Sequence, residues 1–198
     1  RQTLTWNHEN ELASPQRNPG GVLVPQTEKG LTGKGFEFLA EMERMHMIVD
    51  VSHLSDKGFW DIVEHGTRPF AASHSNCRTL APHTRNLTDE MIRALSERGG
   101  IAGLNYYAPF LDTDPTHPEN CRSTVELIAK HAAPYKQVGG AQMIALGSDF
   151  DGIDGPHQLE NAAFLPLLAD ALRKEGFTED EVEGIYYRNA MRFFEENL

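Results

Sequence analysis

Residues 47–53 read Met-Ile-Val-Asp-Val-Ser-His, a short apolar run that ends in a serine and a histidine. Four further runs of this kind lie at 3–6, 69–73, 101–106 and 143–147. Each is short and nearly continuous in apolar character, which is typical of a strand buried on both faces of a parallel sheet. The sequence therefore predicts about five parallel strands.

Helical patterns separate these runs, and most begin at a residue type that favours a helix N-terminus. The expected N-caps are Thr32, Ser55, Thr88 and, in a Thr-x-x-Glu capping box, Thr178. Two more amphipathic segments cover about 123–137 and 160–175, and Pro166 should kink or restart the second. This alternation predicts an α/β fold.

Two α/β architectures remain open at this point. An open doubly wound sheet is one, although no Gly-rich phosphate loop follows any strand, so a nucleotide-binding version has no support. The other is a (β/α)8 barrel, which typically takes about 250 residues, so five strands would be its C-terminal part. We expect residues 1–198 to form a single domain.

The composition excludes several classes of partner. The formal net charge of −11 argues against nucleic acid and against an anionic membrane surface, because both attract basic faces. No apolar run approaches the roughly 20 residues that a membrane-spanning helix needs. Cys77 and Cys121 show no zinc-knuckle or redox spacing. A reducing compartment follows most simply, and we expect a cytoplasmic location, with any leader lying upstream of Arg1.

Three chemically useful side chains follow predicted strands. His53 and His74 end the second and third runs, and Asp149 follows the last. Strand ends carry the chemistry in barrels and open sheets alike, and neutral imidazole with carboxylate suits zinc. A calcium loop beginning at Asp149 is excluded, because Ile153 replaces an oxygen ligand and Asp154 stands where a glycine is required.

The other polar candidates carry weaker indications. Arg85 follows the His74 strand by a loop and could bind a carboxylate bidentately, or it could be an exposed residue beside Asp89 and Glu90. The histidines in helical patterns are expected at the surface or at helix ends: His46, His65 and His131. Loop histidines receive no assigned role: His8, His83, His117 and His157.

Taken together, four motifs resemble the membrane (renal) dipeptidase family of zinc peptidases. They are Ile-Val-Asp-Val-Ser-His53-Leu-Ser, Ala-Ser-His74-Ser-Asn, Arg85-Asn86-Leu-Thr-Asp and Gly-Ser-Asp149-Phe-Asp-Gly. The segment from Thr3 to Ala13 is similar to the end of that family's fourth strand. The match runs through essentially the whole chain in the right order.

The resemblance implies a (β/α)8 metallohydrolase barrel with two zinc ions that cleaves dipeptides. His53 and His74 would ligate one zinc ion, and Asp149 would handle the proton of the metal-bound water or of the leaving amine. Arg85 would bind the terminal carboxylate of the substrate, with Asn86 and Trp6 as further substrate-binding positions. Many members are homodimers, and members often accept a D-amino acid at the C-terminal position.

Two departures from the family pattern carry expectations of their own. Trp6 stands where family members place a substrate-contacting histidine, so side-chain selectivity cannot be carried over. No His-x-Asp pair occurs in the sequence, although the family uses one, with a bridging glutamate, as zinc ligands. We therefore expect the isolated chain to be the C-terminal portion of the barrel, lacking its N-terminal strands, with weak metal binding and negligible peptidase activity.

Three hypotheses remain. The first is a zinc-dependent dipeptidase represented by its C-terminal portion. The second is a non-catalytic remnant that acts as a binding or assembly module. The third is a related barrel metallohydrolase acting on lactones or cyclic amides.

Overall fold

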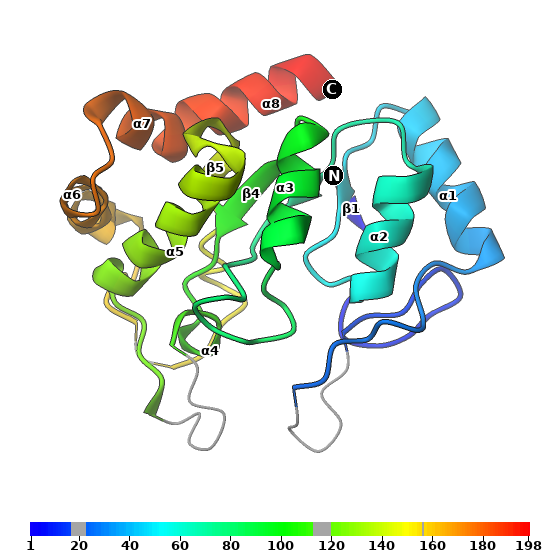
Figure 1. Ribbon diagram of the computed structural model, residues 1–198, viewed down its shortest axis with the longest axis horizontal. Helices are drawn as coiled ribbons and strands as arrows, with labels where there is room; N and C mark the ends of the chain where they lie inside the picture. The colour runs from blue at the N-terminus through cyan, green and yellow to red at the C-terminus, as the bar shows by residue number, and fades with distance from the viewer. Residues whose placement is uncertain (17–22, 113–119, 156) are drawn as a thin grey trace.

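The computed structural model describes residues 1–16, 23–112, 120–155 and 157–198, and His117 lies outside these ranges (Figure 1). Five strands form one sheet in the order β1-β2-β3-β4-β5, and each pairs in parallel with the next along the chain. The strands are β1 (Gln2–Thr3), β2 (Val49–Asp50), β3 (Ala71–Ala72), β4 (Ile101–Leu104) and β5 (Ile144–Leu146). All five predicted runs form strands, although each strand is shorter than its run.

The strand order decides between the two architectures. A doubly wound sheet reverses its strand order at a switch point, whereas this order never reverses. Right-handed crossovers then place every connecting helix on the same face of the sheet. Figure 1 shows α1, α2, α3 and α5 in a row in front of the strands. The sheet is therefore a five-stranded arc of a barrel.

The helices begin largely where their caps predict. They are α1 (Gly33–Arg44), α2 (Asp56–His65), α3 (Asp89–Glu97), α4 (Ala108–Leu111), α5 (Val125–Gly139), α6 (Leu165–Lys174), α7 (Glu179–Glu183) and α8 (Asn189–Asn197). Short 3-10 helices precede β5 and α6, η3 (Ala141–Met143) and η4 (Ala162–Phe164), and a π-helix, η5 (Gly184–Arg188), joins α7 to α8. Neither α4 nor the π-helix was predicted.

The capping side chains explain most of these boundaries. The hydroxyl oxygens of Thr32, Ser55 and Thr88 accept the backbone N–H groups of Gly35, Gly58 and Met91, and Thr178 forms the predicted capping box. Pro166 restarts the helix as predicted, because α6 begins at Leu165. The start of α5 differs by one position, since Thr124 caps it and the Ser123 hydroxyl donates to the Tyr106 carbonyl at 2.6 Å.

The core lies between the strands and this row of helices, with Leu39, Ile62, Ile92 and Ile128 among its fully buried side chains. His131 corrects the expectation of a surface residue. It is 1% exposed, its Nδ1 accepts the Cys77 N–H at 3.0 Å, and its Nε2–H donates to the Leu111 carbonyl at 3.0 Å. Cys77 and Cys121 are buried free thiols. None of the described helices combines the length and apolar character that crossing a membrane requires.

Candidate metal centre and substrate cavity

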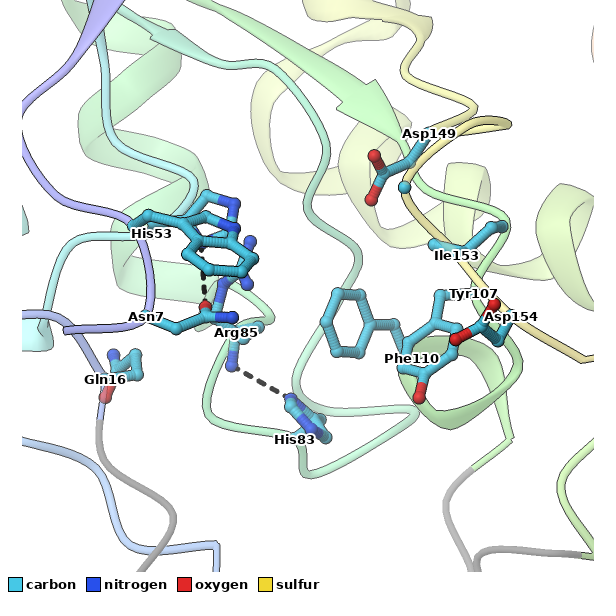
Figure 2. Close-up of a pocket in the computed structure, with 12 residues that line it drawn as sticks. Asn7, Gln16, His53, His83, Arg85, Tyr107, Phe110, Asp149, Ile153 and Asp154 are labelled. Carbon is cyan, nitrogen blue, oxygen red and sulfur yellow. Dashed lines mark hydrogen bonds between the residues drawn. The ribbon is translucent and has the colours of Figure 1, made fainter.

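A cavity of about 610 Å³ opens at the C-terminal ends of the strands. Its walls include four of the predicted site residues, namely Trp6, His53, Arg85 and Asp149. In Figure 2, His53 and Arg85 lie on one side of this cavity, and Asp149, Ile153 and Asp154 lie on the other. His74 borders an adjoining cavity of about 260 Å³, which Asp149 also lines. This arrangement agrees with the rule that a barrel places its site at this rim.

The two histidines form a close pair. Their Nε2 atoms lie 2.9 Å apart, although the residues are separated by 21 positions in sequence. They meet because β2 and β3 are neighbouring parallel strands, and each histidine follows the end of its strand. His53 and His74 therefore come together as the sequence predicts.

The contacts of each ring assign its proton. The Nδ1 of His53 lies 3.2 Å from the Asn7 Oδ1, an oxygen that can only accept, so this ring carries its proton on Nδ1. The Nε2 of His74 lies 3.1 Å from the Arg85 Nη2, which can only donate, so this ring also holds its lone pair on Nε2. Two lone pairs thus converge at 2.9 Å.

That convergence fits a metal ion. Two imidazole nitrogens bound to one zinc ion at about 2.0–2.1 Å, with an angle of about 90–110°, lie about 2.8–3.4 Å apart. The observed separation of 2.9 Å falls in this range. Zinc also prefers neutral imidazole and carboxylate ligands among non-thiol groups. The two histidines therefore suit a pair of ligands to one such ion.

The surroundings keep both rings neutral. Burial, with help from the positive charges of Arg85 and of a protonated His74, lowers the pKa of His53 to about 3. Burial and the Arg85 charge also lower the pKa of His74, against the opposing effect of Asp50 and Asp149. Neutral rings are the form that binds metals, so no proton has to be displaced from Nε2 near neutral pH.

Asp149 faces the same cavity from the far wall. Its backbone has φ 68°, a left-handed conformation that is uncommon for a residue other than glycine. The Asn105 amide donates to its Oδ2 at 3.2 Å, and a Cβ on Gly152 would stand 2.4 Å from its Oδ1. A turn without side-chain bulk at position 152 therefore leaves room for this carboxylate.

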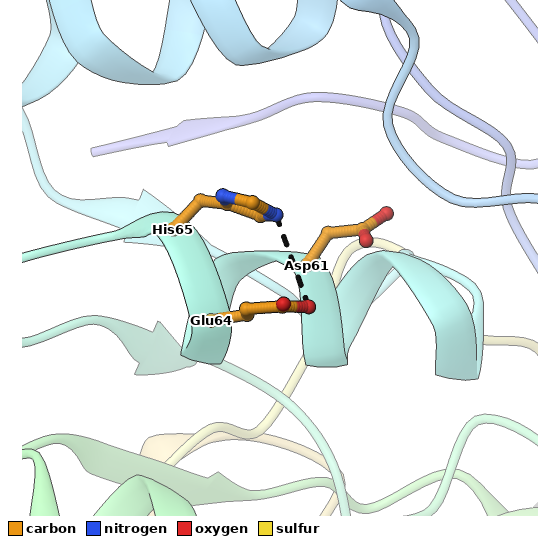
Figure 3. A group of neighbouring side chains, drawn as sticks. All are labelled: Asp61, Glu64 and His65. Atoms are coloured by element: carbon orange, nitrogen blue, oxygen red, sulfur yellow. Dashed lines mark ion pairs between the residues drawn. The ribbon is translucent and has the colours of Figure 1, made fainter.

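Asp149 does not join the histidine pair as a close third donor. Within the described parts of the chain, one group of three His, Cys, Asp or Glu residues has donor atoms all within 4.8 Å of one another, and it lies elsewhere, on α2. That group is Asp61, Glu64 and His65 (Figure 3). Its buried member, Asp61, is already paired with Lys57 and accepts the Leu31 N–H at 2.8 Å, so the cluster is explained by structural contacts.

Arg85 lies against the histidine pair and not beside Asp89 and Glu90. Its Nε donates to the Ser52 carbonyl at 2.5 Å, and its guanidinium carbon stands 5.4 Å from the centre of the Phe110 ring. Burial lowers its pKa to about 10, and the charge of Asp149 opposes that shift. The residue therefore stays cationic at neutral pH and supplies a positive wall to the cavity.

The remaining predicted positions differ in their placement. Trp6 is 65% exposed and lines the cavity, as a substrate-contacting residue would. Asn86 is fully buried, and its amide donates to the carbonyls of Ala81 and Phe110, both at 2.9 Å, while its Oδ1 accepts the Asn76 N–H. Asn86 therefore holds the loop that carries Arg85, and its side chain does not line the cavity.

Several cavity residues have no predicted role in the site. They are Asn7, Gln16, His83, Tyr107, Phe110, Ile153 and Asp154. The Nδ1 of His83 accepts the Arg85 N–H at 3.1 Å, and burial lowers the pKa of His83 to about 4. A rule that also scans the residues just beyond each strand would have found Asn7 after β1 and Tyr107 after β4.

Sequence comparisons find a family model and relatives that match nearly the whole chain. A family model described as "Membrane dipeptidase (Peptidase family M19)" matches residues 1–197. A Klebsiella pneumoniae protein, described as uncharacterized and encoded in the pqqA 5′ region, is 36% identical over 189 residues, covering 94% of this chain and 68% of its own length. An uncharacterized dipeptidase of Schizosaccharomyces pombe is 33% identical over 192 residues, or 96% of this chain and 44% of its own.

Solved structures agree on the architecture. A metallopeptidase from Rhodobacter sphaeroides, crystallised with a phosphinate mimic of the dipeptide L-Ala-D-Ala, matches with a TM-score of 0.87 and 28% identity, over 99% of this chain and 55% of that one. A probable dipeptidase from Pseudomonas aeruginosa has a TM-score of 0.85 at 16% identity over 97% of this chain and 61% of its own, a likeness of fold alone. The chain spans about half the length of several relatives. It covers 44% of the Schizosaccharomyces pombe dipeptidase and 55% of the Rhodobacter sphaeroides metallopeptidase. With the family model matched from residue 1 to residue 197, the chain belongs to the membrane dipeptidase family, peptidase family M19.

Proposed function

We propose that this chain supplies the C-terminal part of a zinc-dependent dipeptidase, which hydrolyses the peptide bond of a dipeptide with a metal-activated water. The observation that carries this proposal is the pair of Nε2 atoms 2.9 Å apart, with the Arg85 Nη2 3.1 Å from that of His74. The Rhodobacter sphaeroides metallopeptidase binds a dipeptide mimic, which supports the same substrate class.

His53 and His74 would hold one zinc ion through Nε2. When bound, zinc lowers the pKa of a water ligand and polarises the scissile carbonyl. Catalytic zinc sites use about three protein ligands, so two histidines are too few. We therefore propose that residues outside these 198 complete a two-zinc site, and that the chain alone has very low peptidase activity.

The chain's own residues would bind and orient the substrate. Arg85 would donate hydrogen bonds to the terminal carboxylate of the dipeptide, because its Nε is fixed on the Ser52 carbonyl while its charge faces the cavity. Asp149 would hold the proton taken from water and return it to the leaving amine, with Asn105 fixing the carboxylate through a 3.2 Å hydrogen bond. Trp6 and Tyr107 would contact the substrate side chains from the cavity wall.

The test compares dipeptides with their C-terminal amides, which lack the carboxylate. Zinc-supported hydrolysis is measured for the chain alone and for the chain fused behind the N-terminal segment of a full-length relative. We expect activity only in the fusion, and we expect Arg85→Met to lower kcat/KM for dipeptides by about 100-fold while changing amide hydrolysis little. The exposed Arg44→Met serves as the matched control.

The proposal fails on either of two results. One is a folded, zinc-loaded fusion that hydrolyses no dipeptide. The other is an equal loss on dipeptides and amides in Arg85→Met, since that would place Arg85 away from the carboxylate. Preference for a lactone or cyclic amide over every dipeptide would support the alternative barrel hydrolase instead.

A further inference from the structure

A polar path runs from the buried carboxylate of Asp50 to the ring of His74. Asp50 ends β2 and is 1% exposed. Its Oδ1 accepts the backbone N–H groups of Ser52 and Ser73, both at 3.1 Å, and its Oδ2 accepts the Ser73 hydroxyl at 2.5 Å. The same hydroxyl oxygen lies 2.7 Å from the Nδ1 of His74. Asp50 itself does not line the cavity that holds Arg85 and Asp149.

Each hydrogen bond on this path has one allowed direction. Arg85 donates to the His74 Nε2 at 3.1 Å and has no acceptor, so the ring proton is on Nδ1. Ser73 must then accept from Nδ1, and its own hydroxyl hydrogen points to Asp50. The carboxylate, which only accepts when ionised, completes the sequence.

We propose that Asp50 and Ser73 are positioning residues that hold His74 in the Nδ1–H tautomer, so that its Nε2 stays unprotonated and a metal ion can take the place of the Arg85 donor at that atom. The proposal rests on the proposed function for the identity of that ion. Ligating histidines commonly donate their second N–H to a carboxylate, and here a serine hydroxyl stands between the two groups. Ser73 meets the His74 ring at Nδ1, and Asp50 acts on the ring through Ser73.

The hydrogen bond at the Nδ1 of His53 is weaker than the one at the Nδ1 of His74. His53 donates to the neutral amide oxygen of Asn7 at 3.2 Å, and Asn7 is exposed. The His74 path is shorter at each step, with distances of 2.7 and 2.5 Å, and ends on a buried charge. Charge-assisted hydrogen bonds are roughly twice as strong as neutral ones. The tautomer of His74 is therefore fixed more firmly than that of His53.

The sharpest test is Asp50→Asn, which keeps the size of the side chain and reverses the direction of the hydrogen bonds from residue 50 through Ser73 to His74. The amide oxygen can still accept the N–H groups of Ser52 and Ser73, but its NH₂ donates to the Ser73 hydroxyl. Ser73 then donates to the His74 Nδ1, and the ring proton moves to Nε2, where it blocks metal binding and faces the Arg85 donor. Ser73→Ala removes the path, and Ser73→Thr restores the hydroxyl.

Two readouts are taken, neither of which needs activity. Long-range ¹H–¹⁵N NMR of the metal-free 198-residue protein reports which nitrogen of His74 carries the proton. Competition with a chromophoric chelator gives the dissociation constant for Zn²⁺ of the fusion with the N-terminal segment of a full-length relative. Ser75→Ala is the matched control, because Ser75 lies at the same strand end, is fully buried, and bonds to the Ser52 hydroxyl and not to the His74 ring.

We expect the Nδ1–H tautomer in the wild type, in Ser73→Thr and in Ser75→Ala, and the Nε2–H tautomer in Asp50→Asn. The Zn²⁺ dissociation constant should rise about 10- to 100-fold in Asp50→Asn and Ser73→Ala and stay within about twofold in the control. An Nε2–H tautomer in the wild type, an unchanged tautomer in folded Asp50→Asn, or an unchanged Zn²⁺ dissociation constant in Ser73→Ala would overturn the proposal. If Asp50→Asn does not fold, the wild-type tautomer and the Zn²⁺ dissociation constant of Ser73→Ala decide.

Failure of the proposed function gives a different pattern. A wild-type His74 with its proton on Nδ1, in a folded fusion that binds no Zn²⁺, supports the positioning path and removes the metal. Tight Zn²⁺ binding together with an Nε2–H ring in the metal-free protein keeps the metal and removes the path.

Discussion

Replacing Arg78 should destabilise the protein strongly, because this side chain ties the Arg85 loop to the start of α2. Its guanidinium donates to both oxygens of Asp56, at 2.7 and 2.8 Å, and to the carbonyls of Asn86 and Thr84, each at 2.8 Å. The side chains of Arg78 and Asp56 are only 14% and 10% exposed. The pair is therefore largely removed from water.

The magnitude follows from what remains after truncation. In Arg78→Ala, the Asp56 carboxylate keeps the Gln16 amide at 2.5 Å and loses its cation, while two carbonyls lose their donor. Removing one partner of a buried ion pair typically costs about 3–5 kcal/mol. Against a total stability of about 5–15 kcal/mol, this is a large fraction. Arg78→Lys keeps the positive charge but not the forked guanidinium, so it should lose less stability than Arg78→Ala.

Urea unfolding followed by circular dichroism measures the loss. We expect the midpoint of Arg78→Ala to fall by one to several molar at an unchanged m-value, since a slope of about 1–3 kcal/mol/M applies. Arg173→Ala is the control, because that arginine pairs with Asp170 and Glu179 on the surface, and its midpoint should not shift resolvably. Equal midpoints for the two variants would refute the reasoning.

Two further predictions concern pH and the Asp149 turn. Burial lowers the pKa of His131 below 6.5, so the unfolded chain takes up this proton first and stability must fall as pH drops below about 6.5. Between about pH 6.5 and 5, the urea midpoint of His131→Gln should fall less with decreasing pH than that of the wild type. The exposed His8→Gln is the control and should fall as the wild type does. The same pH dependence in all three proteins would contradict the role assigned to His131. Gly152→Ala should leave the melting temperature nearly unchanged, because position 152 is exposed, yet its Cβ would stand 2.4 Å from the Asp149 Oδ1. Displacing that carboxylate by about 1 Å should lower kcat of the zinc-loaded fusion by up to about 100-fold, and an unchanged kcat would contradict this expectation.

The order of the strands and helices, and the closeness of His53 to His74, could be predicted from the pattern of residues in the sequence. His53 and His74 follow consecutive runs, and consecutive runs in this fold become neighbouring parallel strands. Capping chemistry is equally local, which is why Thr32 and Thr178 mark true helix starts. These inferences depend on residues that are close in sequence or on a simple strand order.

Other features depend on contacts between distant segments and could not be predicted. His131 occupies a helical pattern like that of a surface residue, but its two partners lie 54 and 20 positions away. The tautomers of His53 and His74 depend on which side chains reach their Nδ1 atoms. Asn86 follows Arg85 directly, yet the turn sends one side chain to the cavity and the other into the interior.

The proposed function depends on the Nε2 atoms of His53 and His74 binding one metal ion. The most direct measurement is an anomalous difference map, at the zinc absorption edge, from crystals of the fusion with the N-terminal segment of a full-length relative, grown with Zn²⁺. We predict the strongest peak between the two Nε2 atoms, at about 2.0–2.1 Å from each. A map with no peak there, or with zinc only at the Asp61, Glu64 and His65 cluster on α2, would contradict the account.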